Sequence, residues 1–287
     1  MTLCLCGAAH RPGLGRRALL ASAVMLAALP ARAQAPAQAP APAPASAGAP
    51  GPALLEDLVA ANRILFDQGV VDGFGHVSAR HDKDPNRYLL ARSMAPALVG
   101  PEDIMEFDLD SFAVDARGRA VYLERFIHGA IYQARPDVGA IVHSHSPAVI
   151  PFADTKVVMR PMNHIAGFLG AGVAMFEIRD TAGGSTDMLI RDAGLGHALA
   201  RTLGSRDIAL MRGHGSVAVA RDIRRAVFRA VYTEVNARSQ GEALRLAGTY
   251  AGTPEYLNDA EAKAAASTND GLVDRPWELW KRRAMAK

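Results

Sequence analysis

A tract made almost entirely of Ala, Pro, Gln, Ser and Gly at residues 34–53 limits where this chain can fold. The tract contains six of the 17 prolines and too few large apolar side chains to bury a core. We expect a disordered linker there, extended and partly of polyproline II character. From Leu54 onward the composition is that of an ordinary globular domain. We predict that it spans residues 54–252, with a C-terminal tail containing a short helix at 253–287.

The segment before the linker has the three parts of an export signal, so we assign residues 1–33 to a signal peptide. A basic region ends in Gly15-Arg16-Arg17, an apolar run extends from Ala18 to Leu29, and Ala31-Arg32-Ala33 offers small residues for cleavage. The paired arginines favour the twin-arginine (Tat) route, and a Sec signal or an uncleaved anchor is the alternative. The apolar run is shorter than the ~20 residues that span a bilayer. We therefore expect a periplasmic or secreted protein without stable membrane insertion after cleavage.

The formal net charge of +3 comes from the signal segment. Four of the 32 Lys and Arg residues lie in residues 1–33, so the remaining 28 face 29 Asp and Glu residues. Cys4 and Cys6 lie in the same segment, which leaves no cysteine for a disulfide, a thiolate nucleophile or a metal site in the body. The body has no basic cluster with interleaved aromatic residues, so we expect no nucleic-acid partner.

Hydrophobic patterning predicts a mixed α/β domain. Helices are expected at 54–69, 124–134, 187–203 and 223–246, with a final amphipathic turn around Trp277 and Trp280. Strands are expected at 73–80 (a turn into a strand), 87–92, 104–109, 140–145, 208–211 and 216–219. Because helices and strands do not alternate strictly, one α/β or α+β domain is the predicted class.

Histidines carry the strongest chemical signal. His143 and His145 stand two apart at the end of an apolar strand, so both imidazoles can reach one point. His214 lies between two glycines, which let a backbone approach a ligand closely. Three imidazoles with an open coordination position are typical of a catalytic divalent metal site. Glu124 would add a fourth ligand or a base, and the alternative is a helix N-terminal residue favoured by the helix dipole. His128, one turn later on the same face, would orient that carboxylate or have a structural role.

Several separated motifs, in order along residues 54–250, resemble the class II aldolase/adducin family. They are Gly75-x-Val77-Ser78-x-Arg80, Pro101-x-Asp103-Ile104, Glu124-x-x-x-His128, Arg135-Pro136-Asp137-Val138-x-Ala140-Ile141-Val142-His143-x-His145-Ser146 and Arg212-Gly213-His214-Gly215. The resemblance implies a single-domain α/β/α sandwich around a mostly antiparallel central sheet. It also implies a homotetramer with active sites at subunit interfaces.

The same resemblance implies the roles of the polar residues. His143, His145 and His214 match the family's metal ligands, with Zn²⁺ the usual metal and Mn²⁺, Co²⁺ or Fe²⁺ as alternatives. Glu124 matches the catalytic glutamate. Adducin-like members lack the metal histidines, so their presence here favours an enzyme.

The chain departs from the sugar-phosphate aldolases of the family where those enzymes hold phosphate. His76 replaces an Asn, and Arg92-Ser93 stands in place of a Ser/Thr-Gly or Ser-Ser pair. Arginines would suit a carboxylate instead, although surface arginines and a core histidine are the alternative interpretations. The candidate substrate-binding residues are His76, Ser78, Arg80, Arg92 and Ser93. His164, between the histidine pair and His214, is a second candidate catalytic residue.

This variant most resembles the family branch of metal-dependent decarboxylases for carboxy-muconic-semialdehyde-type acids. We therefore predict a metal-dependent C–C lyase that decarboxylates a small oxygenated carboxylic acid through a metal-stabilised enolate. Two alternatives remain. One is an aldolase that releases an aldehyde from a hydroxy-keto acid or a sugar (phosphate). The other is a non-catalytic, adducin-like binding protein.

Overall fold

The computed structural model describes residues 46–286. The predicted signal peptide at 1–33 and the linker up to residue 45 lie outside the described residues. The last residues of the predicted linker contact the body, because Ser46 Oγ donates to Glu106 Oε2 at 2.5 Å and Gly51 N donates to Asp82 Oδ2 at 2.9 Å. The first helix begins at Pro52, two residues before the predicted boundary.

A seven-stranded sheet forms the centre of the described part, in the order β3-β2-β1-β4-β7-β6-β5. Only the β5–β6 pair is parallel among these strands. This confirms the mostly antiparallel sheet. The strands are β1 His76–Arg80, β2 Arg87–Ala91, β3 Ile104–Asp108, β4 Ala140–Ser144, β5 Ala174–Phe176, β6 Ile208–Met211 and β7 Gly215–Ala220.

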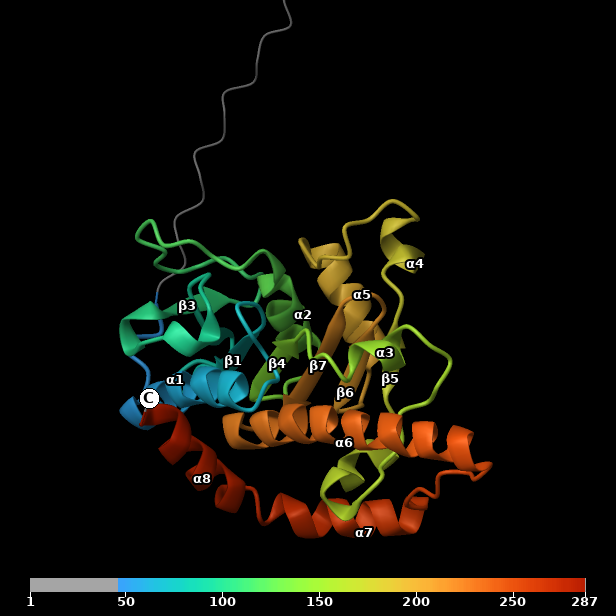
Figure 1. Cartoon of the computed structure of the whole chain (residues 1–287). Helices are drawn as coiled ribbons and strands as arrows, with labels where there is room; N and C mark the ends of the chain where they lie inside the picture. Colours follow the sequence, from blue (N-terminus) through green and yellow to red (C-terminus); the bar gives the residue numbers. More distant parts are fainter. Residues whose placement is uncertain (1–45, 287) are drawn as a thin grey trace, which may run out of the picture. The chain divides into compact units, whose positions relative to one another are not determined.

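Helices cover both faces of the sheet, which confirms the α/β/α sandwich (Figure 1). Successive residues of β4 point to opposite faces of the sheet. Val142 joins the core formed with α1 (Pro52–Asp67) and α6 (Ile223–Tyr250). Ile141 joins the opposite core, under α2 (Phe126–Ala134) and α5 (Ala193–Leu203). Such alternation is the pattern of a strand buried on both faces.

Short elements connect these layers. They are α3 Ile150–Ala153, α4 Arg179–Ala182 and the 3₁₀ turns η1 Pro96–Leu98, η2 Pro101–Asp103, η3 Leu123–Arg125 and η4 His164–Ala171. No helix of the described residues is long and apolar enough to cross a membrane.

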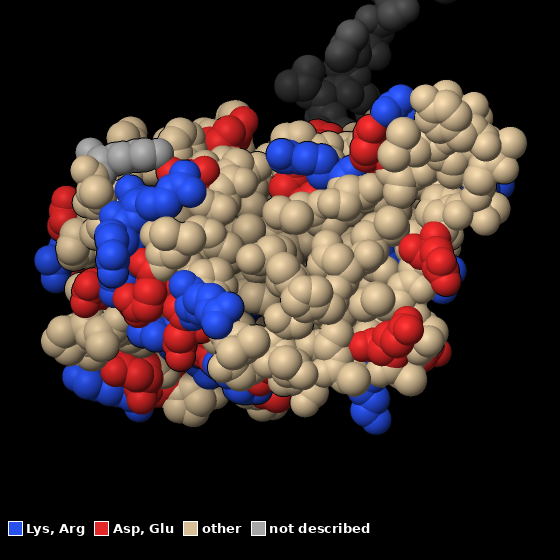
Figure 2. Space-filling view, turned by 60° about the horizontal axis from the view of Figure 1, so that its bottom comes forward, with Lys and Arg blue, Asp and Glu red and all other residues tan. Residues whose placement is uncertain are grey.

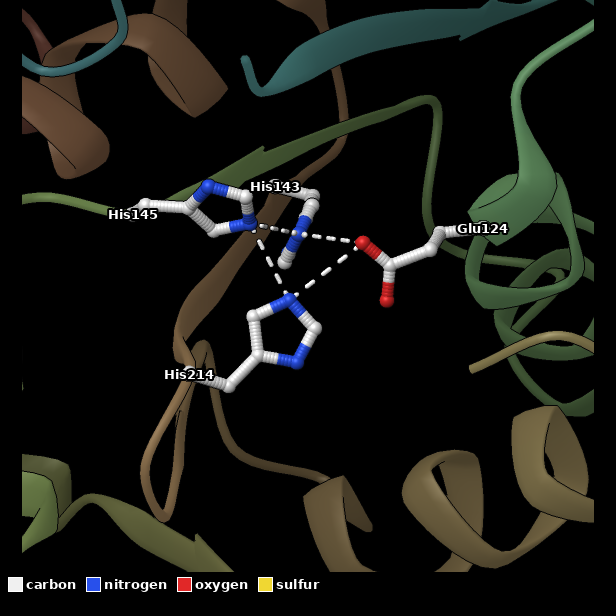
Figure 3. A group of neighbouring side chains, drawn as sticks. All are labelled: Glu124, His143, His145 and His214. Carbon is white, nitrogen blue, oxygen red and sulfur yellow. Dashed lines mark hydrogen bonds and ion pairs between the residues drawn. The ribbon is translucent and has the colours of Figure 1, made fainter. Parts of the chain in front are cut away.

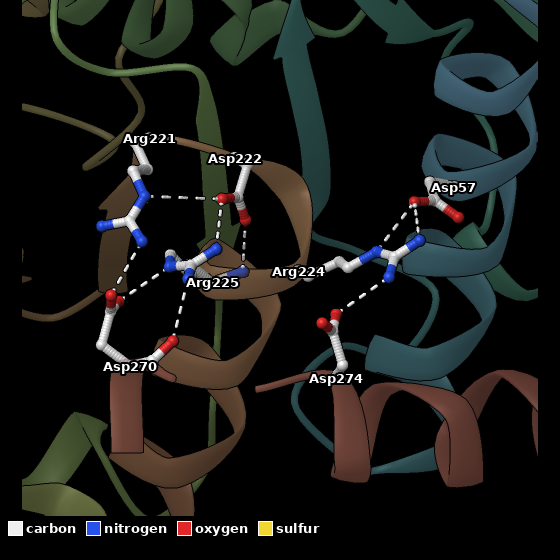
Figure 4. Close-up of polar contacts among 7 residues, drawn as sticks. All are labelled: Asp57, Arg221, Asp222, Arg224, Arg225, Asp270 and Asp274. Carbon is white, nitrogen blue, oxygen red and sulfur yellow. Dashed lines mark hydrogen bonds and ion pairs between the residues drawn. The ribbon is translucent and has the colours of Figure 1, made fainter. Parts of the chain in front are cut away.

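The C-terminal tail contains two helices, α7 (Asp259–Asp270) and α8 (Asp274–Met285), where the sequence predicted one short helix. Trp277 and Trp280 of α8 are buried in the core that α1 and α6 share. Figure 4 shows how arginines at the start of α6 hold the tail. Arg224 pairs with Asp57 of α1 at 3.1 Å and with Asp274 of α8 at 2.8 Å.

Two predicted helices begin later than their patterns indicated. The segment 187–192 is a loop, and α5 begins only after Asp192, whose Oδ1 accepts a hydrogen bond from Leu195 N at 2.9 Å. Glu124 lies in the 3₁₀ turn η3 with non-helical backbone angles (φ −90°, ψ 17°), just before α2. In both cases the irregular segment reaches the site described below.

Charges of both signs mix on the face shown in Figure 2. Lys and Arg side chains lie beside Asp and Glu on the left of this view, and a broad uncharged area occupies its centre.

Candidate metal centre

Three imidazoles and one carboxylate converge on a single point (Figure 3). His145 Nε2 lies 3.2 Å from His143 Nε2 and 3.0 Å from His214 Nε2. Glu124 Oε2 lies 3.5 Å from His143 Nε2 and 3.3 Å from His214 Nε2. All four candidate ligand atoms lie within 4.8 Å of one another. The structure thus brings together the three histidines and the glutamate that the sequence indicated.

Strand ends and a tight turn deliver the three histidines. His143 is in β4, and His145 lies just beyond its end. His214 is in the turn between β6 and β7, next to Gly213 with φ +63°. A Cβ on Gly215 would lie 2.0 Å from the carbonyl oxygen of Ser144, so only glycine allows β7 to approach β4 this closely. The two glycines therefore place His214 opposite the histidine pair.

Backbone groups orient the converging side chains. His143 Nδ1 donates to the Ser216 carbonyl at 3.1 Å, and His214 Nδ1 donates to the Met188 carbonyl at 2.8 Å. Each neutral imidazole then directs its Nε2 lone pair toward the cluster, which is the orientation that a metal ligand needs. Glu124 Oε1 accepts a hydrogen bond from Ile190 N at 2.9 Å, which leaves Oε2 facing the imidazoles.

The donor set fits a divalent cation. The Nε2 lone pairs of His143 and His214 and the Glu124 carboxylate face one another as acceptors and would repel, and a cation at their centre removes that repulsion. Tetrahedral ligands about 2.0–2.1 Å from a metal lie about 3.3 Å apart, close to the 3.0–3.5 Å found for four pairs of these atoms, and the whole set lies within 4.8 Å. Nitrogen and carboxylate donors suit Zn²⁺ and other first-row divalent metals.

Electrostatics at the cluster favour a neutral His145 and an ionised Glu124. Burial, followed by the charges of His143 and His214, lowers the pKa of His145 to about 4. Burial alone would raise the pKa of Glu124, but the neighbouring His143 and His214 outweigh it and hold that pKa well below its usual range. Both directions favour the protonation states that bind a metal.

A cavity of about 290 Å³ opens beside the cluster. Glu124 and His145 form part of its wall, and the remaining wall combines aromatic, aliphatic and small polar side chains. Those residues include Phe74, His76, Ser93, Met94, Tyr122, Leu123 and Leu189. Its volume lies near the lower end for small-molecule sites, about 300 Å³, so it suits a small ligand.

Of the predicted substrate-binding residues, His76 and Ser93 line this cavity. Ser78 is fully buried behind it and bonds to His128 and Tyr132. Arg92 is partly exposed and pairs with Asp103 at 2.6 Å. His128 bonds to His76 and Ser78, which are therefore its partners in place of the expected Glu124.

Arg80 and His164 do not line the cavity either. Arg80, at the far end of β1 from His76, donates to the carbonyls of Val138, Tyr132 and Arg135. Its guanidinium is therefore occupied by the backbone. His164 is exposed at the start of η4, which packs against α7. Within this chain, neither residue faces the cavity.

Other residues contribute to the site without having been predicted. Tyr122 lies 4.5 Å from the His76 ring, between ring centroids, and Phe74 lies at the cavity wall. Phe74 directly precedes the motif that begins at Gly75, and Tyr122 lies two residues before Glu124. Their proximity in sequence to predicted site residues could therefore have identified them. The Met188 carbonyl and the Ile190 N–H had no such signal, because every residue except proline carries both groups.

Comparisons with known proteins agree with this fold. Residues 56–240 match the model of the Class II Aldolase and Adducin N-terminal domain. Decarboxylase tropJ of Talaromyces stipitatus is 34% identical over 243 residues, which cover 78% of this chain and 91% of that protein. The 3,4-dihydroxyphthalate decarboxylase of Arthrobacter keyseri is 30% identical, over 61% of this chain and 73% of its own length. The L-fuculose 1-phosphate aldolase structure from Glaciozyma antarctica PI12 superposes with a TM-score of 0.66 at 22% identity, covering 80% of this chain and 88% of that one.

Proposed function

The chain belongs to the class II aldolase and adducin family, and we propose that it is a metal-dependent lyase that decarboxylates a small oxygenated carboxylic acid. The observation that carries the proposal is the convergence of three histidine nitrogens and one carboxylate beside a small cavity. Two of the relatives are decarboxylases by name, which supports loss of CO₂ over release of an aldehyde.

His143, His145 and His214 would hold the cation, with Zn²⁺ as the first candidate and Mn²⁺, Co²⁺ or Fe²⁺ as alternatives. When bound, a divalent cation supplies Lewis-acid stabilisation of negative charge that develops on a substrate oxygen. Glu124 would contribute a fourth ligand or act as the base. The backbone bonds from His143, His214 and Glu124 keep these side chains in position before substrate arrives.

Glu124 is the residue that we assign to proton transfer. It is ionised at neutral pH, so it can accept the proton of a substrate hydroxyl. When the bond to the carboxyl carbon breaks, CO₂ leaves and the electron pair stays on the substrate. Glu124 then returns the proton to the substrate carbon that carried the carboxyl group, which leaves the Glu124 carboxylate as it began.

The cavity wall favours a planar, conjugated acid. Phe74, Tyr122 and Leu189 supply apolar surface, and His76 and Ser93 supply hydrogen-bonding groups. An aromatic hydroxy acid, or a product of ring cleavage, combines a flat apolar body with the polar oxygens that such a wall can hold. The name of the 3,4-dihydroxyphthalate decarboxylase supports the aromatic class.

A product assay separates the candidate functions. We would incubate Zn²⁺-loaded protein with hydroxylated benzoates and phthalates, hydroxy-keto acids and sugar phosphates, and measure CO₂ and aldehyde release. Release of CO₂ supports the proposal, and release of an aldehyde would identify an aldolase. Protein that retains no divalent metal and turns over no substrate would favour adducin-like binding.

The chain's location and assembly are further parts of the proposal. The twin-arginine-like segment at 1–33 supports export to the periplasm or secretion, which cell fractionation and N-terminal sequencing test. A homotetramer with active sites at subunit interfaces is supported by apolar side chains at the cavity. Phe74 is 69% exposed and Leu123 is 59% exposed, and a neighbouring subunit would cover both. Light scattering of the purified protein tests the tetramer.

A further inference from the structure

A chain of four hydrogen-bonded side chains runs through the buried sheet layer and ends at the cavity. Tyr132 Oη lies 2.8 Å from Ser78 Oγ, which lies 2.6 Å from His128 Nδ1. His128 Nε2 lies 2.7 Å from His76 Nδ1. Tyr132, Ser78 and His128 are at most 1% exposed, and His76 is 3% exposed and lines the cavity.

Which atom donates in each of these hydrogen bonds follows from Tyr132, the residue at the buried end of the series. Among the described residues, Ser78 is the only hydrogen-bond partner of the Tyr132 hydroxyl. A buried hydroxyl hydrogen without an acceptor is costly, so Tyr132 donates to Ser78 Oγ. Ser78 has a single hydrogen, and it must then be donated to His128 Nδ1.

The same reasoning fixes both imidazoles. With Nδ1 accepting, neutral His128 carries its hydrogen on Nε2 and donates it to His76 Nδ1. His76 then carries its own hydrogen on Nε2, the ring nitrogen that has no partner among the described residues. The Tyr132 hydroxyl has no second hydrogen-bond partner among the described residues that could connect it to solvent. These side chains therefore fix the tautomer of His76 and do not conduct protons from solvent.

We propose that Ser78 and His128 are positioning residues that hold His76 as a neutral Nε2–H donor, and that this donor binds an acceptor oxygen of the substrate, such as a carboxylate. The substrate contact rests on the proposed function, whereas the tautomer does not. A fixed donor selects against a substrate that presents a hydrogen at that position, because two donors would then face each other. This gives the His76 position a specificity role.

The tautomers can be measured without any substrate. We would record magic-angle-spinning NMR spectra of purified, Zn²⁺-loaded, ¹⁵N-histidine-labelled protein and assign signals with His76→Gln and His128→Gln variants. We expect His76 and His128 as Nε2–H tautomers, and His143 and His214 as Nδ1–H tautomers. An Nδ1–H tautomer at His76 would overturn the proposal, whatever reaction the protein catalyses.

Two variants test which residue sets the tautomer of His76. Ser78→Ala removes the donor to His128 Nδ1, so we expect a mixture of His76 tautomers. Tyr132→Phe is the matched control, because Ser78 still has His128 as an acceptor and the Nε2–H tautomer should persist. A single unchanged tautomer in Ser78→Ala would show that another group sets the direction, contrary to the proposal.

Binding of a carboxylate probe tests the substrate contact. We would titrate Zn²⁺-loaded protein with 2-hydroxybenzoate by calorimetry. His76→Leu should weaken binding roughly 10- to 100-fold, as expected for loss of a hydrogen bond to a charged group. His76→Gln, whose amide can present an N–H near the Nε2 position, should stay within a few-fold of wild type. Equal affinity of wild type and His76→Leu, or no binding by either, would overturn the contact and leave the tautomer result standing.

Discussion

Replacing His143 by alanine tests the metal centre through the stability of the fold. A cation that binds only the folded state stabilises it by about 2.7 kcal/mol at about a hundredfold excess over its Kd. At about 2–4 °C per kcal/mol for a domain of this size, Tm should rise by roughly 5–11 °C in wild type. The assay is thermal unfolding of chelator-stripped protein, with and without added ZnCl₂.

The His143→Ala variant should show almost no such rise. His143 Nε2 is one of the converging donors, 3.2 Å from His145 Nε2 and 3.5 Å from Glu124 Oε2, and alanine supplies no replacement. We expect an affinity loss of about a thousandfold, beyond the 10–100-fold typical of outer partners. At the same Zn²⁺ concentration the stabilisation then falls below about 0.1 kcal/mol. Comparing each variant with and without Zn²⁺ cancels the cost of truncating a buried side chain.

His164→Ala is the matched control, because the sequence placed His164 among the catalytic candidates and the structure leaves it exposed on η4. It should keep the full rise in Tm and the full metal content measured by mass spectrometry. A normal rise in His143→Ala, or a lost rise in His164→Ala, would refute the reasoning from the geometry.

Three further outcomes are expected. Glu124→Gln should lower kcat by about 10²–10⁴-fold at equal metal content, because the amide can keep the Ile190 N–H bond but cannot accept a proton; a kcat within threefold of wild type would argue against the assigned role. Metal-free protein should lose stability as the pH falls from about 6.5 toward 4. Burial lowers the pKa of His128 to about 3, and burial with neighbouring charge lowers that of His145 to about 4, so only the unfolded chain, with values near 6.5, binds those protons in this range. Urea midpoints that stay constant between pH 7.5 and 4.5 would contradict this. Trp277→Ala should destabilise the fold by about 3–5 kcal/mol, since the side chain is fully buried, whereas Leu279→Ala on the exposed side of α8 should change stability by about 0.5 kcal/mol or less in the same urea titration.

Most of the sheet was predictable, because its strands are short apolar runs bounded by turns. The strands around His143 and His214 were expected close to their observed limits, and the Gly-His-Gly turn pointed to a close backbone approach. Local patterns of this kind depend on a few neighbouring residues, and these residues are read directly from the chain.

Two residues predicted at the site, Arg80 and His164, lie elsewhere because of contacts with segments that are distant in sequence. Arg80 has the chemistry of a carboxylate ligand, but carbonyls of the segment 132–138 occupy its guanidinium. His164 has the chemistry of an acid or base, but packing of η4 against α7 leaves it away from the cavity. Of the two tail helices, the sequence predicted α8 as a short helix around Trp277 and Trp280 but missed α7, which packs against η4, a segment distant in sequence.

The sequence by itself determined which chemistry is available. It supplied a body without cysteine, three histidines at strand ends and the motifs of a known family. These features restrict which atoms can bind a metal, because the residue type fixes the donor atoms. Only the tertiary structure decided how those donors are used. It set the tautomers of His143 and His214 through backbone carbonyls, and it linked Tyr132 to His76 across the buried layer. The physical reason is that the direction of a hydrogen bond depends on every partner in its network, and those partners meet only when the sheet and its helices pack.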